Sequence, residues 1–264
     1  MNLLELYNYY FELPLYSKVQ FDVDEDCDKL FELMWSDRGI DAYNPTIKEN
    51  TTYFIVQPHS KHYSLKVYNG LIVTKLYCTR TKEIVNVVSW LDYENGNIQK
   101  IGQYPSIAHF HISKIKDYQK VLDKEKIKEL SRAIGLAANG IGIGSFVYLR
   151  RIFEYLLEKE HQKAKLKGDW NEELYIKSKV VERIEMLKDY LPSFLSDNKT
   201  LYGILSVGIH SLKEDDCLQY FETVKIGIEL ILDEELEKYR KDQKILDAKK
   251  KIGIVTQQIK EQNK

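Results

Sequence analysis

Short runs of β-branched and aromatic residues mark the first hundred positions of the chain. These runs are TTYFIVQ, LIVTKLYC and EIVNVVSWLDY, and their composition is typical of strands. Asn95-Gly96 follows the last of them, and an Asn-Gly pair between apolar runs is the strongest short signal of a hairpin. We therefore predict a small β-rich module over residues 1–105, with an irregular or helical insertion at about 22–50.

After residue 105 the apolar positions recur every three or four residues, which is the spacing of amphipathic helices. Pro192 ends one of these stretches, because proline cannot donate its backbone N–H inside a helix. The predicted helices cover 123–138, 145–167, about 171–191 and about 212–259. We therefore predict an α+β protein, in which the β-rich module precedes an antiparallel four-helix bundle over 106–240 and a helical extension over 241–264.

The end of the chain carries a narrow apolar seam among many charges. Its members are spaced three and four residues apart, as in a coiled coil, at Ile245, Ala248, Ile252, Val255 and Ile259. The seam spans only about two heptads, fewer than the three or four that identify a coiled coil. Two interpretations stay open: a terminal helix docked on its own body, or self-association into a homodimer.

Composition narrows the classes of function. The 39 Lys and Arg residues nearly balance 40 Asp and Glu residues, so the net charge of −1 gives no global attraction to nucleic acid or acidic membranes. No apolar run reaches the eighteen or so residues that span a bilayer, and the acidic start MNLLELYNYYFELP differs from a signal peptide. Three widely separated cysteines also argue against a secreted disulfide framework. We expect a cytoplasmic protein with no membrane partner.

Two local patterns suggest ligand sites at first sight. Gly140, Gly142 and Gly144 precede a helix, but a Walker loop follows a strand and contains a lysine, so we predict close helix packing there. His109 and His111 alternate as on an extended segment, yet no third metal ligand stands at a matching spacing. Neither pattern predicts a cofactor.

Adjacent arginines lie in the helix predicted over 145–167. At 100° per residue, its apolar residues gather on one side. They are Phe146, Leu149, Ile152, Phe153, Leu156 and Leu157. Arg151 falls opposite them and is expected to be solvated, whereas Arg150 borders the apolar face and can pair with Glu154 one turn later.

A half-buried guanidinium needs more acceptors than one glutamate, because it carries five N–H donors. The segment LSVGIHSL offers His210, which we expect at the start of the last long helix, where the helix dipole favours a neutral imidazole. Arg150, Glu154 and His210 then form a candidate cluster. It is either a structural network between helices or a binding or catalytic site.

The string Arg150-Arg151-Ile152-Phe153-Glu154, followed about fifty residues later by Gly208-Ile209-His210, resembles a bacterial HEPN-like family of uncharacterised proteins. The strings KIGQYPS and IGIGSFVYLRRIFE are similar to strings of the same family. The resemblance implies an antiparallel four-helix bundle that is often dimeric. It also implies a place in prokaryotic antiviral or toxin systems, where active members are metal-independent ribonucleases with an Arg and His on one helix. That Arg-to-His spacing is missing here.

The resemblance therefore favours a non-catalytic sensing or interaction module with a protein partner in a defence or stress system. One alternative is a divergent endoribonuclease, with His210 as general base and Arg150 stabilising the phosphate. Another is a small-ligand receptor with its pocket in the bundle, and nucleic acid or a nucleotide stays possible as a partner.

Relatives of this kind tend to carry a zinc ribbon in front of the bundle. Here Cys27 and Cys78 are the only thiols in that part of the chain, and two cysteines cannot close a tetrahedral zinc site. The resemblance thus implies a degenerate ribbon, and we expect no metal, with Cys27 and Cys78 as the weak candidates for a ligand pair.

Overall fold

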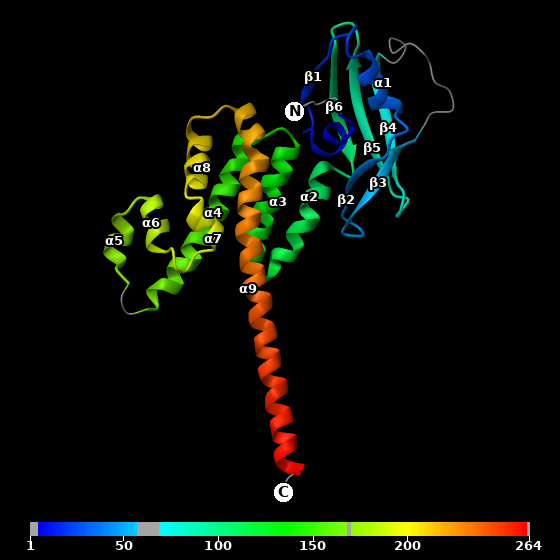
Figure 1. Ribbon diagram of the computed structural model, residues 1–264. Coiled ribbons are helices and arrows are strands. Elements are labelled where there is room, and N and C mark those ends of the chain that lie inside the picture. The colour runs from blue at the N-terminus through cyan, green and yellow to red at the C-terminus, as the bar shows by residue number, and fades with distance from the viewer. Residues whose placement is uncertain (1–4, 57–68, 168–169, 263–264) are drawn as a thin grey trace.

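The computed structural model of the chain describes residues 5–56, 69–167 and 170–262. Within these ranges, the side chains of 113, 114, 208–210, 257 and 260–262 lie outside the description. A curled antiparallel sheet packs beside a group of helices, and the last helix runs through this group and far beyond it (Figure 1). Among the described residues, no helix is long and apolar enough to cross a membrane.

The sheet has six strands in the order β1-β6-β5-β4-β3-β2, and every pair is antiparallel. The strands are β1 (Lys18–Gln20), β2 (Ile40–Asn44), β3 (Glu49–Ile55), β4 (Gly70–Cys78), β5 (Ile84–Asp92) and β6 (Asn97–Tyr104). The predicted hairpin at Asn95-Gly96 is confirmed, because β5 and β6 pair directly up to Asp92 and Asn97. Gly96 has a φ of +61°, and a side chain there would meet the carbonyl oxygen of Phe21 at 2.5 Å.

One face of the sheet carries a core of its own. Helix α1 (Cys27–Trp35) and the short π-helix η1 (Asn8–Glu12) cover this face with buried aromatic and leucine side chains. Lys100 of β6 is completely buried in this core, where its ammonium group donates to the carbonyl oxygen of Tyr9 at 2.8 Å and to Oε1 of Gln103 at 3.2 Å. A small ribbon-like module was therefore the wrong prediction, because the sheet curls into a half-barrel with its own hydrophobic core.

The helical part is also more divided than predicted. Its elements are α2 (Ile107–Ile115), η3 (Lys116–Lys120), α3 (Lys124–Ala138), α4 (Gly142–Lys165), α5 (Glu172–Lys177), α6 (Val180–Met186), α7 (Ser193–Asp197), α8 (Thr200–His210) and α9 (Glu214–Gln262). The predicted four-helix bundle is wrong. The helix expected over 171–191 breaks into two, because Ser178 is extended at the end of α5 and Glu182 accepts from the backbone N–H of Lys179 at the start of α6.

Helix α4 is the centre of the helical part and packs against α3, α8 and α9. All six residues predicted for its apolar face are buried, so the predicted helix phase is confirmed. The predicted close packing at the glycines is confirmed at Gly142, where a Cβ would lie 2.5 Å from the Glu214 carbonyl oxygen and 2.8 Å from Cβ of Cys217. The Glu214 carboxylate of α9 accepts from the backbone N–H groups of Gly142 and Ile143, which begin α4.

Helix α9 has 49 residues, a length of about 74 Å. Residues 214–236 include its buried side chains, whereas every described side chain from 237 onward is exposed. In Figure 1 this second half stands free of the body. A terminal helix docked on its own body was therefore the wrong interpretation. The domain limits at 105 and 240 stay predictions.

Candidate functional site

Arg150 lies between α4 and α8. Its Nε donates to Oε1 of Glu154 at 2.8 Å, and its Nη2 donates to the hydroxyl of Tyr202 at 3.1 Å. The hydrogen bond to Glu154 raises the pKa of Arg150 despite partial burial, and the guanidinium also lies 5.4 Å from the centre of the Tyr202 ring. Tyr202 is thus an acceptor that the sequence pattern did not reveal. These contacts favour a structural role for the pair.

His210, the third member of the predicted cluster, is the last residue of α8, not a residue at the start of α9. It follows Tyr202 by eight residues, which is about 12 Å of helix rise. Its side chain lies outside the described residues. The structure therefore brings Arg150 and Glu154 together, and the part of His210 stays a prediction.

Arg151 points away from the apolar face, as predicted, and half of its side chain is exposed. The expectation that it is merely solvated is wrong. Its Nη2 lies 2.6 Å from Oε1 of Glu129 in α3, and Glu129 is buried. Lys126 reaches the other carboxylate oxygen of Glu129 at 2.8 Å. Two cations thus neutralise one buried carboxylate between α3 and α4.

The two candidate cysteines have separate surroundings. Cys27 begins α1 and is partly buried, whereas Cys78 ends β4 and is completely buried. Burial raises the pKa of Cys78, but hydrogen bonds from Thr81, Thr51 and Arg80 outweigh burial and lower that pKa to about 7. Across the part of the chain that the structure describes, no three His, Cys, Asp or Glu side chains come together as metal ligands.

A cavity of about 510 Å³ lies between the sheet module and the helices. Lys225 of α9, only 3% exposed, lies 2.5 Å from Glu222 and 3.4 Å from Nδ1 of His111 in α2. Burial and the charge of Lys225 lower the pKa of His111, whose Nε2 lies 3.9 Å from Glu12 of η1. These four side chains pair with one another along the cavity wall. Sequence reasoning missed the cavity because they come from η1, α2 and α9.

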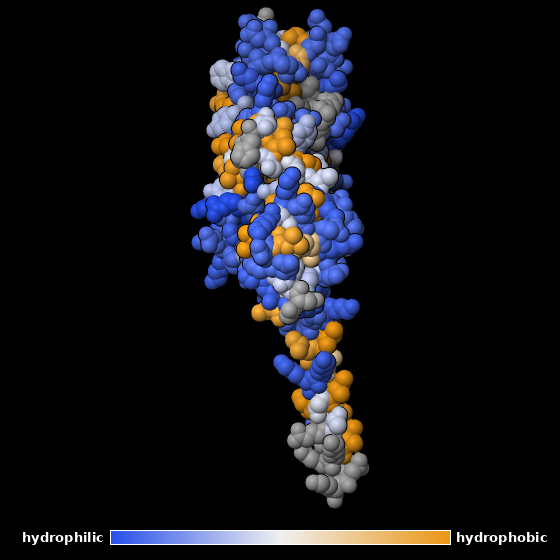
Figure 2. All heavy atoms as spheres, turned by 90° about the vertical axis from the view of Figure 1, so that its left-hand side faces the viewer, coloured by the Kyte–Doolittle hydropathy of each residue, from blue (hydrophilic) through white to orange (hydrophobic). Residues whose placement is uncertain are grey.

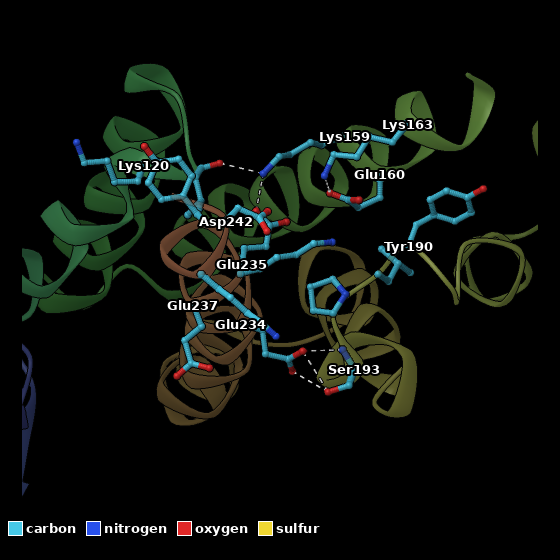
Figure 3. A pocket seen from close by; sticks show the side chains of 16 residues that line it. Lys120, Lys159, Glu160, Lys163, Tyr190, Ser193, Glu234, Glu235, Glu237 and Asp242 are labelled. Carbon is cyan, nitrogen blue, oxygen red and sulfur yellow. Dashed lines mark hydrogen bonds and ion pairs between the residues drawn. The ribbon is translucent and has the colours of Figure 1, made fainter. Parts of the chain in front are cut away.

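A second hollow, of about 660 Å³, lies where α9 leaves the body. Figure 3 shows charged side chains of α4 and α9 facing one another across it. Lys159 donates to the carbonyl oxygen of Val121 at 3.1 Å and to Glu235 at 2.5 Å. Glu234 accepts from the backbone N–H groups of Ser193 at 2.7 Å and of Phe194 at 2.9 Å, at the start of α7. These contacts hold α9 firmly at its exit from the body.

Beyond this exit lies the arm, which we define as residues 238–262. It exposes the predicted apolar seam, including Ile245, Ile252, Val255 and Ile259, with Ile252 65% exposed. Figure 2 shows apolar patches between hydrophilic ones on the free end of the molecule. Residues 238–259 contain seven basic and two acidic residues, whereas the first half of α9, residues 214–237, contains nine acidic residues and one basic residue. The arm is thus a basic, amphipathic helix that continues the acidic first half of α9.

No family model, no curated protein and no solved structure matches this chain. Indications of function therefore come from the geometry of the chain itself. In the polar clusters around Arg150, Glu129 and Lys225, side chains satisfy one another. The arm differs from them, because its apolar seam faces water along its whole described length.

Proposed function

We propose that the protein is an interaction module that binds an acidic, amphipathic helix along its arm. The observation that carries this proposal is the row of exposed Ile and Val side chains on a helix that leaves the body. Full burial of one such side chain contributes about 1.5 to 3 kcal/mol, so covering the seam is strongly favourable. A helix that only connected or capped the body would gain no stability from apolar side chains that stay in water.

The shape of the seam supports a helical partner rather than a membrane surface. Its members follow one another at alternating steps of three and four, which gives the narrow stripe of a coiled coil and not the broad apolar face of a membrane-bound helix. Lys244, Lys249 and Lys251 flank the stripe at the positions that select partners by charge. An acidic helix complements these flanks.

A place in a prokaryotic defence or stress system stays a prediction from the resemblance to HEPN-like proteins. The alternative of a ribonuclease built on His210 and Arg150 also stays a prediction, although the engagement of Arg150 with Tyr202 and Glu154 supports a structural role for that arginine.

A designed peptide tests the proposal. The probe is a labelled helix with Leu and Ile at its seam positions and Glu at its flanking positions. We expect the full chain to bind it in fluorescence anisotropy and a chain ending at Arg240 not to bind it. The shortened chain should keep its cooperative thermal transition, because the described arm side chains contact water. Equal binding by both chains would refute the proposal.

Matched substitutions sharpen this test. Ile252→Ser with Ile259→Ser should weaken peptide binding by at least about tenfold, since two seam side chains are lost. Ile254→Ser removes an equally exposed isoleucine on another side of the arm and should leave binding unchanged. A probe with Lys at its flanking positions should bind more weakly than the acidic probe.

A further inference from the structure

The packed half of α9 also presents apolar side chains to water. Ile226 is 46% exposed and Leu230 is 41% exposed, although neighbouring positions of the same helix are buried in the body. At 100° per residue these two fall within about 80° of the arm residues Ala248, Ile252 and Val255 on the helical wheel. The arm seam and the exposed face of the packed half thus form one continuous line along α9.

The charges along this line change sign at its middle. Asp233 and Glu237 are acidic and exposed on the packed half, and Lys241 and Lys244 are basic and exposed at the start of the arm. One helix therefore carries both complementary surfaces, an acidic one on the body and a basic one on the arm.

We propose that the acidic helix bound by the arm is the packed half of α9 in a second copy of this chain. The two α9 helices then run antiparallel and are related by a two-fold axis, so that each arm covers the exposed face of its partner's packed half. This inference rests on the proposed function and adds the identity of the partner.

The register of the two antiparallel α9 helices follows from the positions of their apolar and charged residues. In an antiparallel pair, residues that face each other have a constant sum of residue numbers, and one sum aligns two apolar pairs and one pair of opposite charges. Ile252 then faces Ile226, Ala248 faces Leu230, and Lys241 faces Glu237. The two-fold axis crosses near Tyr239, which lines the hollow where α9 leaves the body.

The parallel arrangement is disfavoured by the same charges. It would place Glu237 opposite Glu237 and Lys241 opposite Lys241 of the second copy. Like charges at facing positions destabilise a coiled coil, whereas the antiparallel register turns each of these repulsions into an ion pair. The antiparallel register therefore places Ile252 and Ala248 against apolar residues of the second copy and also removes both charge repulsions.

Sedimentation equilibrium of the full chain, whose mass is 31.1 kDa, tests this inference. We expect a reversible dimer. Glu237→Lys and Lys241→Glu should each raise the dimer dissociation constant by at least about tenfold, because each creates two repulsive contacts. The double variant Glu237→Lys with Lys241→Glu should restore the dimer. Lys250→Glu, the same charge reversal on the opposite side of the arm, should have little effect.

Three outcomes would overturn this inference, and the binding of the acidic peptide tests the proposed function independently of them. A chain that stays monomeric but binds the acidic peptide has an arm that docks a helix of another protein. A dimer that survives shortening of the chain at Arg240 uses another surface, and a double variant that fails to dimerise contradicts the proposed register. Loss of peptide binding would decide separately against the proposed function.

Discussion

Raising the pH from 7 to 10 should increase the free energy of unfolding by about 3 to 4 kcal/mol through Lys100 alone. Lys100 is completely buried in the core of the sheet module, and burial lowers its pKa to about 7, with the negative charge of Glu12 opposing this effect only in part. Its ammonium group has the Tyr9 carbonyl and the Gln103 amide as acceptors. Because these two acceptors are neutral and burial removes water from the ammonium group, the charged form is costly in the folded protein.

The direction of the effect follows from proton binding. Between pH 7 and the ordinary lysine pKa of about 10.5, the unfolded chain holds a proton on Lys100 that the folded chain has released. Stability from this group is thus complete above pH 10.5 and is lost as the pH falls to about 7.

Denaturant unfolding of the wild type and Lys100→Met from pH 7 to pH 10 measures the effect. The wild type should gain stability over this range, and the variant should gain much less. Cys78, whose pKa is also lowered to about 7, titrates in the same direction in both proteins, so the difference between them isolates Lys100. Lys75→Met, at an exposed position of β4, is the matched control. An equal gain in stability with pH in the wild type and in Lys100→Met would show that Lys100 keeps its ordinary pKa.

Removing both cations from Glu129 should be far more damaging than removing either one. Lys126→Ala or Arg151→Ala alone should cost about 1 kcal/mol, because the remaining cation still pairs with the carboxylate. The double substitution leaves a buried carboxylate without a cation, and this should cost about 3 to 5 kcal/mol. The loss should therefore exceed the sum of the two single losses.

The origin of this loss can be checked in the same background. Adding Glu129→Gln to the double variant removes the unpaired charge and should recover a large part of the stability. Lys128→Ala, an exposed lysine on the same helix, should change stability by no more than about 0.5 kcal/mol. Strictly additive losses in denaturant melts would mean that water reaches Glu129 and solvates it.

Strong periodicity made part of the fold predictable. The phase of α4 followed from six apolar residues, and the hairpin between β5 and β6 followed from Asn95-Gly96. Helix α2 was missed because AHFHIS alternates over too few residues to distinguish a strand from a short helix. Strands β1 and β2 were missed, since three to five residues with polar alternation pair only through the rest of the sheet, whereas TTYFIVQ predicted most of β3.

The sequence also predicted only those parts of the candidate sites that lie on a single helix. The pair of Arg150 and Glu154 lies one turn apart on one helix, so helical geometry predicted it. Tyr202 and Glu129 come from other helices, and no spacing along the sequence places them beside the arginines. The arm seam was visible as a heptad, but Ile226 and Leu230 could join it only once the buried face of α9 was known.

The distance between the two arms tests the pairing of α9 most directly. A nitroxide label on Lys250→Cys, in a Cys27→Ser background that keeps the buried Cys78 and Cys217, reports this distance by pulsed electron paramagnetic resonance. The antiparallel register separates the two labels by about 33 Å along the helix axis, giving a measured distance of roughly 35 to 45 Å. A distance under about 30 Å would show parallel arms. The absence of a dipolar signal would show that the arms do not pair.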